Sequence, residues 1–120
     1  MKNIALVIED DTDLSSIFVK ALEQAGFEVE PIQDGEIAQK RLLEVVPQVI
    51  VLDLHLPHIN GGTLLKQIQA TEALNKTRII ITTADAEQAD MYRGKVTIVM
   101  VKPISYSQLR DISARLKIQE

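Results

Sequence analysis

The sequence predicts an α/β protein, a doubly wound parallel sheet of five strands with helices on both faces. Two observations lead to this fold class. Short runs of β-branched apolar residues alternate along the chain with longer segments in which apolar residues recur at helical spacing. The apolar runs contain few polar residues, which is typical of parallel strands covered on both faces. Because crossovers between parallel strands are right-handed, this alternation places helices on both faces of one sheet.

Five segments are predicted to form the strands. Four are apolar, too short for helices and expected to be buried, and they are Ile4–Ile8, Val49–Leu52, Arg78–Thr82 and Thr97–Val101. The fifth, Glu28–Ile32, alternates polar and apolar residues and contains Pro31, which has no N–H to donate to a neighbouring strand. We therefore expect Glu28–Ile32 at an edge of the sheet.

Helical spacing of apolar residues marks the segments that follow the first two strands. The first helix is predicted from Leu14, Ile17, Phe18, Ala21, Leu22 and Ala25. Gly26 comes next, at the position where helices commonly end in a left-handed backbone conformation. The second helix is predicted to stop before Pro47, and its apolar residues are Ile37, Ala38, Leu42 and Val45.

Two more helices and one weak segment complete the alternation. The third helix follows the turn Asn60-Gly61-Gly62 and carries Leu64, Leu65 and Ile68. Ser105 and Gln108 have the spacing of a capping box, and the last helix that they open presents Leu109, Ile112 and Leu116. The segment Asp85–Gly94 has few apolar residues, so any helix there is expected to be short or marginal.

Length and composition restrict the class of protein. A chain of 120 residues is expected to form a single domain over residues 1–120. It has no cysteine, which excludes disulfides and thiolate metal sites. Its 17 acidic and 13 scattered basic residues give a net charge of −4, which argues against nucleic-acid binding by this segment. The first apolar run is too short to span a membrane, so we expect a cytoplasmic protein with no membrane partner.

Polar residues stand where the predicted strands end. Those residues are Glu9 and Asp10 after the first strand, Asp53 after the third, Thr83 after the fourth and Lys102 after the fifth. Each has a plain structural explanation when it is taken alone, and Asp11 or Asp13 in particular could simply cap the following helix. However, the carboxyl ends of parallel strands meet at one edge of the sheet. The topology therefore predicts that these side chains lie together.

The chemistry of these residues is complementary. Three carboxylates at one edge form an oxygen site suited to Mg²⁺. With the cation present, Asp53 can act as a nucleophile toward a phosphoryl group while the Lys102 ammonium neutralises charge on the phosphoryl oxygens. The Thr83 hydroxyl can donate a hydrogen bond to a phosphoryl oxygen after transfer.

On these residues the sequence resembles the response-regulator receiver domain of two-component signalling, over essentially the whole chain. The resemblance is carried by the stretches VIEDD, VIVLDLHLPHINGG, IIITTADA and VKP. It implies a flavodoxin-like sheet with strand order 2-1-3-4-5. It also implies phosphorylation of Asp53, with Thr83 as the switch hydroxyl and Lys102 as the conserved-type lysine. The implied Mg²⁺ ligands are Glu9, Asp10, Asp53 and the backbone carbonyl of His55.

The resemblance implies partners as well. A sensor histidine kinase or a histidine phosphotransfer protein would supply the phosphoryl group, and a downstream output domain or protein would respond. The domain would then be a phosphoacceptor that assists its own phosphorylation and dephosphorylation, not an enzyme with an external substrate.

Two departures from the receiver pattern concern signal output. Receivers usually carry Tyr or Phe three residues before the lysine, and here that residue is Val99. The interval from Thr83 to Lys102 is also shorter than usual by about one helical turn. Because valine has no ring to rotate, we expect the response to phosphorylation to be expressed in the segment after Thr83.

Three alternatives stay open at this point. A phosphatase of the haloacid-dehalogenase type would need an acid at position 55, where the chain has His55. A flavodoxin-like flavin-phosphate binder would need a loop that attracts phosphate, but EDDTD would repel it. A receiver-shaped interaction module without chemistry would be favoured by the loss of Asp53 or Lys102, and both are present.

Overall fold

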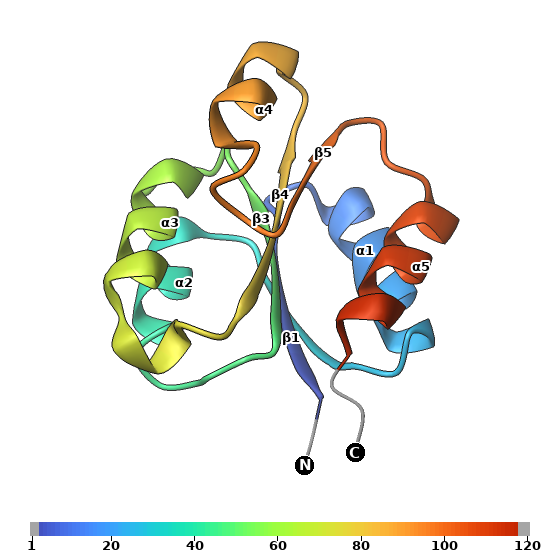
Figure 1. Cartoon of the computed structure of the whole chain (residues 1–120), viewed down its shortest axis with the longest axis horizontal. Helices are drawn as coiled ribbons and strands as arrows, with labels where there is room; N and C mark the ends of the chain where they lie inside the picture. The colour runs from blue at the N-terminus through green and yellow to red at the C-terminus, as the bar shows by residue number, and fades with distance from the viewer. Residues whose placement is uncertain (1–2, 118–120) are drawn as a thin grey trace.

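The computed structural model describes residues 3–117 and has the predicted fold class (Figure 1). Five parallel strands form one sheet in the order β2-β1-β3-β4-β5. The strands are β1 (Ile4–Ile8), β2 (Glu28–Ile32), β3 (Val49–Asp53), β4 (Arg78–Thr83) and β5 (Ile98–Val101). The helices are α1 (Thr12–Gln24), α2 (Gly35–Arg41), α3 (Gly61–Ala70), α4 (Ala86–Tyr92) and α5 (Tyr106–Leu116), with a 3-10 turn η1 at Glu72–Leu74. None of the described helices has the length and apolar character needed to cross a membrane.

Helices cover both faces of the sheet. Figure 1 shows α1 and α5 on one side, α2 and α3 on the other, and α4 at the top of the view. Successive side chains of a strand point to opposite faces, so each face has its own apolar core. In β1, Leu6 and Ile8 pack in the core under α2 and α3, whereas Ala5 and Val7 pack in the core under α1 and α5.

The two edge strands differ from the buried centre. β2 is an edge strand as predicted, and Pro31 lies opposite Val7 of β1. The expectation that Thr97–Val101 is a buried strand is wrong in part, because β5 forms the other edge. It begins at Ile98, and Met100 is its one buried residue. An apolar run shows that a strand forms but not where it lies in the strand order.

Helix ends follow the capping signals more closely than the apolar spacing. The predicted capping box of Ser105 and Gln108 is present at the start of α5, and Gly26 has a φ of 103° after α1. By contrast, α2 ends at Arg41, well before Pro47, and Ile37 is 59% exposed instead of facing the core. The predicted weak helix is α4, which has seven residues and only Ala89 buried.

Candidate functional site

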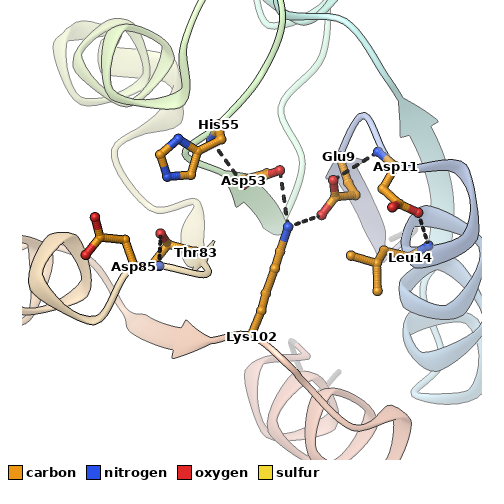
Figure 2. A network of polar contacts seen from close by, with 8 residues as sticks. All are labelled: Glu9, Asp11, Leu14, Asp53, His55, Thr83, Asp85 and Lys102. Atoms are coloured by element: carbon orange, nitrogen blue, oxygen red, sulfur yellow. Dashed lines mark hydrogen bonds and ion pairs between the residues drawn. The ribbon is translucent and has the colours of Figure 1, made fainter.

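The parallel topology brings the predicted site residues to one rim (Figure 2). Glu9 follows β1, Asp53 is the last residue of β3, Thr83 is the last of β4, and Lys102 follows β5. The backbone N–H of Lys102 donates to the Thr83 carbonyl over 2.7 Å, which continues the pairing of β4 with β5 up to the rim. The residues that the sequence places at strand ends therefore lie at one edge of the sheet, where Lys102 reaches both Glu9 and Asp53.

The Lys102 ammonium lies between two buried carboxylates. Its Nζ donates to Glu9 Oε1 over 2.7 Å and to Asp53 Oδ2 over 3.3 Å. The side chains of Glu9 and Asp53 are only 1% and 3% exposed, and that of Lys102 is 19% exposed. Because water contributes little here, the ammonium is the main compensation for both negative charges among the described residues.

The pKa values reflect two carboxylates that share one cation. Burial raises the pKa of Glu9 above its ordinary value, and the nearby Asp53 carboxylate adds to the shift against the opposing effect of Lys102. Burial alone would lower the pKa of Lys102, but the hydrogen bond to Glu9 and the charge of Asp53 outweigh it and raise the pKa. The lysine is thus held in its charged form, and this one ammonium faces two carboxyl groups.

The backbone around Asp53 holds its carboxylate in place. Its Oδ1 accepts a hydrogen bond of 3.1 Å from the backbone N–H of His55, while Oδ2 faces Lys102. Helix α3 begins directly against this segment: a Cβ atom at Gly61 would lie 2.2 Å from the Asp53 carbonyl oxygen. Only glycine permits that approach, so Gly61 positions the connection between β3 and α3 beside the site.

A third carboxylate completes the acidic cluster. One oxygen each from Glu9, Asp10 and Asp53 lie within 4.8 Å of one another, with Asp10 exposed and the other two buried. Three carboxylates with one open side suit Mg²⁺, which binds few protein oxygens and keeps several waters. The donor set therefore fits the predicted cation. The role of the His55 backbone carbonyl as a further ligand stays a prediction.

The acidic residues near the start of the chain have two different roles. Asp11 is the N-cap of α1, and its Oδ1 accepts a hydrogen bond of 2.9 Å from the backbone N–H of Leu14. The N–H of Asp11 in turn donates to Glu9 Oε2 over 3.1 Å. The capping interpretation is thus right for Asp11, whereas Glu9 and Asp10 belong to the carboxylate cluster, and Asp13 lies in the first turn of α1.

Thr83 lies at the rim, but its hydroxyl is bonded to the segment that connects β4 with α4. Its side chain is fully buried, and its Oγ1 accepts a hydrogen bond of 3.1 Å from the backbone N–H of Asp85. Across residues 3–117 its hydroxyl has no hydrogen bond to Asp53 or Lys102. Contact between this hydroxyl and a phosphoryl group stays a prediction.

Sequence analysis missed a polar pocket beside Asp53. It has a volume of about 250 Å³ and is lined by Leu54, His55, Asn60, Gly62, Gln88 and Tyr92. The Oε1 atom of Gln88 is buried and has no hydrogen-bond partner in the described chain. The spacing of Gln88 and Tyr92, four residues apart in α4, could have shown that they share a helix face. Nothing in the sequence indicates that this face meets His55.

Comparison with known proteins gives consistent results. The family model of the response regulator receiver domain matches residues 5–113. The chain is 35% identical, over 106 residues, to the phosphate regulon transcriptional regulatory protein PhoB of Rhizobium meliloti. That alignment covers 86% of this chain and 47% of the relative, so the chain spans about half of the relative's length.

Solved structures agree on the fold. The chemotaxis response regulator CheY4 of Vibrio cholerae superposes with a TM-score of 0.86 at 23% identity, covering 97% of this chain and 99% of that one. The receiver domain of the sensor histidine kinase PA1611 from Pseudomonas aeruginosa superposes with a TM-score of 0.84 at 24% identity, covering 97% and 98%. The latter structure has a magnesium ion coordinated in its active-site cleft.

Proposed function

Because the chain belongs to the response regulator receiver domains of two-component systems, we propose that it is a phosphoacceptor and that its acceptor group is the Asp53 carboxylate. The observation that carries this proposal is the position of Asp53. Its carboxylate contacts the Lys102 ammonium, belongs to the acidic cluster and stands at the end of β3, the middle strand of the sheet. Glu9 shares these contacts, but its tighter ion pair with Lys102, at 2.7 Å, suits a supporting role.

In the proposed reaction an oxygen of Asp53 forms a bond to phosphorus while the bond between phosphorus and the donor's nitrogen breaks. The electron pair of the broken bond stays with the donor imidazole, and Asp53 becomes an acyl phosphate. Lys102 neutralises negative charge on the phosphoryl oxygens, since its Nζ already lies 3.3 Å from Asp53 Oδ2. Thr83 donates its hydroxyl to a phosphoryl oxygen once transfer is complete.

Glu9, Asp10, Asp53 and the backbone carbonyl of His55 would hold Mg²⁺. When bound, the cation offsets the repulsion between the carboxylates and the incoming phosphoryl oxygens. The burial of Glu9 and Asp53 supports this role, because water alone leaves two such carboxylates poorly compensated.

The partners follow from the same proposal. The phosphoryl donor is a sensor histidine kinase or a histidine phosphotransfer protein, and residues 1–120 act as one receiver domain. A downstream output domain or protein responds to the change at Asp53. The domain assists its own phosphorylation and dephosphorylation and has no external substrate.

Intact mass after incubation with phosphoramidate, with and without Mg²⁺, tests the proposal. We expect one acid-stable, base-labile phosphoryl group in the parent and none in Asp53→Asn. The matched control is Asp13→Asn, the same change at an exposed acid of α1, which should be modified like the parent. Modification of Asp53→Asn, or unaltered modification in excess chelator, would contradict the mechanism. No modification of the parent at all would favour a receiver-shaped module without chemistry.

A further inference from the structure

A groove runs over the surface between α3 and α4. Its volume is about 270 Å³, and its apolar lining is formed by Leu65, Met91 and Tyr92. Lys66 and Lys95 line it as well. At the same place Gln69 Nε2 donates to the Lys95 carbonyl over 3.1 Å and so ties α3 to the chain after α4. We call this surface, defined by these residues, the α3–α4 groove.

The groove is basic although the chain is acidic overall. No carboxylate lines it, and neither Lys66 nor Lys95 makes an ion pair within residues 3–117. The chain as a whole has a net charge of −4. Two unpaired ammonium groups beside an apolar lining that includes Met91, 63% exposed, are complementary to an apolar side chain flanked by carboxylates.

Tyr92 separates this groove from the phosphorylation site. Its side chain lines both the α3–α4 groove and the polar pocket that contains His55. A Cβ atom at Gly62 would lie only 3.0 Å from the Tyr92 hydroxyl, so the glycine leaves room for the ring against the first turn of α3. His55 in turn donates its backbone N–H to Asp53. His55, whose backbone is bonded to Asp53, therefore lines the same pocket as Tyr92, and Tyr92 also lines the groove.

The polar pocket contains two polar groups that have no partner among the described residues. The buried Oε1 of Gln88 has no donor in the described structure, and an unpaired buried acceptor is unfavourable. The Tyr92 hydroxyl also has no hydrogen-bond partner there, and both residues lie on one face of α4. Gln88 and Tyr92 thus bring two polar groups without partners into the pocket that His55 also lines, so Tyr92 is the residue of the groove that adjoins the surroundings of Asp53.

We propose that the α3–α4 groove is a docking surface for an acidic protein segment, and that Tyr92 transmits the phosphorylation state of Asp53 to it. An apolar side chain of the partner lies on Leu65 between Met91 and Tyr92. Carboxylates beside it pair with Lys66 and Lys95. The inference rests on the proposed function, because phosphorylation of Asp53 is its input.

Binding of a labelled peptide to the full chain tests the proposal. The probe is an amphipathic peptide with one leucine flanked by glutamates. Its binding is measured by fluorescence anisotropy with and without beryllium fluoride and Mg²⁺, which together mimic the phosphorylated state of Asp53. We expect beryllium fluoride to raise the affinity by about fivefold or more, which is typical of coupling between two sites. A peptide with lysines in place of the glutamates should not bind.

Charge reversal locates the site. Lys66→Glu/Lys95→Glu should lose binding in both states, whereas Lys20→Glu/Lys76→Glu, the same change at two exposed lysines outside the groove, should bind like the parent. Tyr92→Leu keeps the lining apolar but removes the hydroxyl, so it should bind the peptide but no longer respond to beryllium fluoride. Equal binding of the acidic and basic peptides, or binding that survives charge reversal in the groove, would overturn the proposal.

Two further measurements separate the possible failures. In the first, the same protein preparations are treated with phosphoramidate in place of beryllium fluoride, and their intact mass and peptide affinity are both measured. If Asp53 is modified but the peptide affinity does not change, the inference fails and the proposed function stands; if Asp53 is not modified, both fail. Sedimentation of the chain tests a second copy as the occupant. Self-association that Lys66→Glu/Lys95→Glu abolishes would show that the groove is a dimer interface and would overturn the proposal that it binds an acidic segment of another protein.

Discussion

Helices α4 and α5 precede and follow β5, and they are built very differently. α5 has eleven residues and a capping box, and it buries Leu109 and Ser113 completely. α4 has seven residues, buries only Ala89, and is followed by Gly94 with a φ of 82°. The difference indicates which flank of the domain can rearrange at low cost. Segments with few buried apolar contacts open with the smallest free energy.

The same difference bears on how the proposed phosphorylation of Asp53 would change the rest of the domain. Both flanks connect to the rim, α4 through the hydrogen bond between Asp85 and Thr83 and α5 through the chain after Lys102. Val99 on β5 is half-buried and has no ring that could turn inward. A phosphorylation-induced change should therefore be expressed on the α4 flank, where the structure resists least.

The largest effect that distinguishes the flanks is expected from core truncation. Leu109→Ala in α5 should lower the free energy of unfolding by about 2–5 kcal/mol, because it leaves a cavity in the core under α1 and α5. Met91→Ala in α4 should change it by no more than about 0.5 kcal/mol, because Met91 is exposed. Urea unfolding measures both. Similar losses in the two variants would show that α4 is as firmly packed as α5.

The second prediction concerns the response to phosphorylation. Phosphorylation, or beryllium fluoride with Mg²⁺, should alter amide hydrogen exchange mainly over residues 84–95, with little change over residues 106–117. The expected change on the α4 flank is about tenfold in exchange rate, which corresponds to about 1.4 kcal/mol. Hydrogen exchange with mass spectrometry measures it. Strong change across α5 with little change across α4 would contradict this expectation, because the response would then reach α5 although Val99 replaces the usual aromatic residue.

The third prediction concerns the acidic cluster at the rim of the sheet, to which both flanks connect. Asp10→Ala removes one of three neighbouring carboxylates, so without Mg²⁺ the variant should be more stable than the parent by about 1 kcal/mol. With Mg²⁺ the order should reverse, because the parent alone keeps the full site. Urea unfolding at both conditions measures this. An Asp10→Ala protein that is less stable without Mg²⁺ would show that the acid supports the fold itself.

The rim could be predicted from sequence because its residues need only the strand alternation and one topological rule. Glu9 and Lys102 are 93 residues apart, yet each directly follows an apolar run, and parallel strands bring such positions together. The amino-acid sequence alone therefore indicates that the acidic pair, Asp53 and Lys102 share one site. The strand order itself came from the resemblance and is confirmed.

The α3–α4 groove and the polar pocket could not be predicted in the same way. They depend on the Tyr92 ring meeting the backbone at Gly62, a contact between helices that no periodic pattern records. Likewise, Ile37 fits an apolar helical spacing, but its side chain is exposed, and α2 ends already at Arg41. The ends and the orientation of such short helices depend on their caps and contacts, and the spacing of apolar residues does not predict these.

The smallest predicted effect lies in α2, which has seven residues like α4 and is also capped by an aspartate. Asp34 caps α2, and its Oδ2 lies 2.5 Å from His58 Nδ1 in the connection between β3 and α3. Partial burial alone would raise the pKa of Asp34. The hydrogen bonds from His58 and from the backbone N–H groups of Glu36 and Ile37 outweigh it and lower the pKa below 3.8.

A lowered pKa in the folded state means that the Asp34 carboxylate stabilises the fold above pH 3.8 and that this contribution is lost as the pH falls through the lowered value. His58→Asn removes the partner while keeping a residue suited to the φ of 67° at this position. Its acid unfolding should begin at a slightly higher pH than that of the parent, and the difference should shrink in high salt because the pair is partly exposed. Acid titrations followed by circular dichroism at low and high salt measure the shift. Curves that superpose at low salt would show that the His58 contact does not hold α2, and that the bonds from the Asp34 side chain to the backbone of α2 are sufficient.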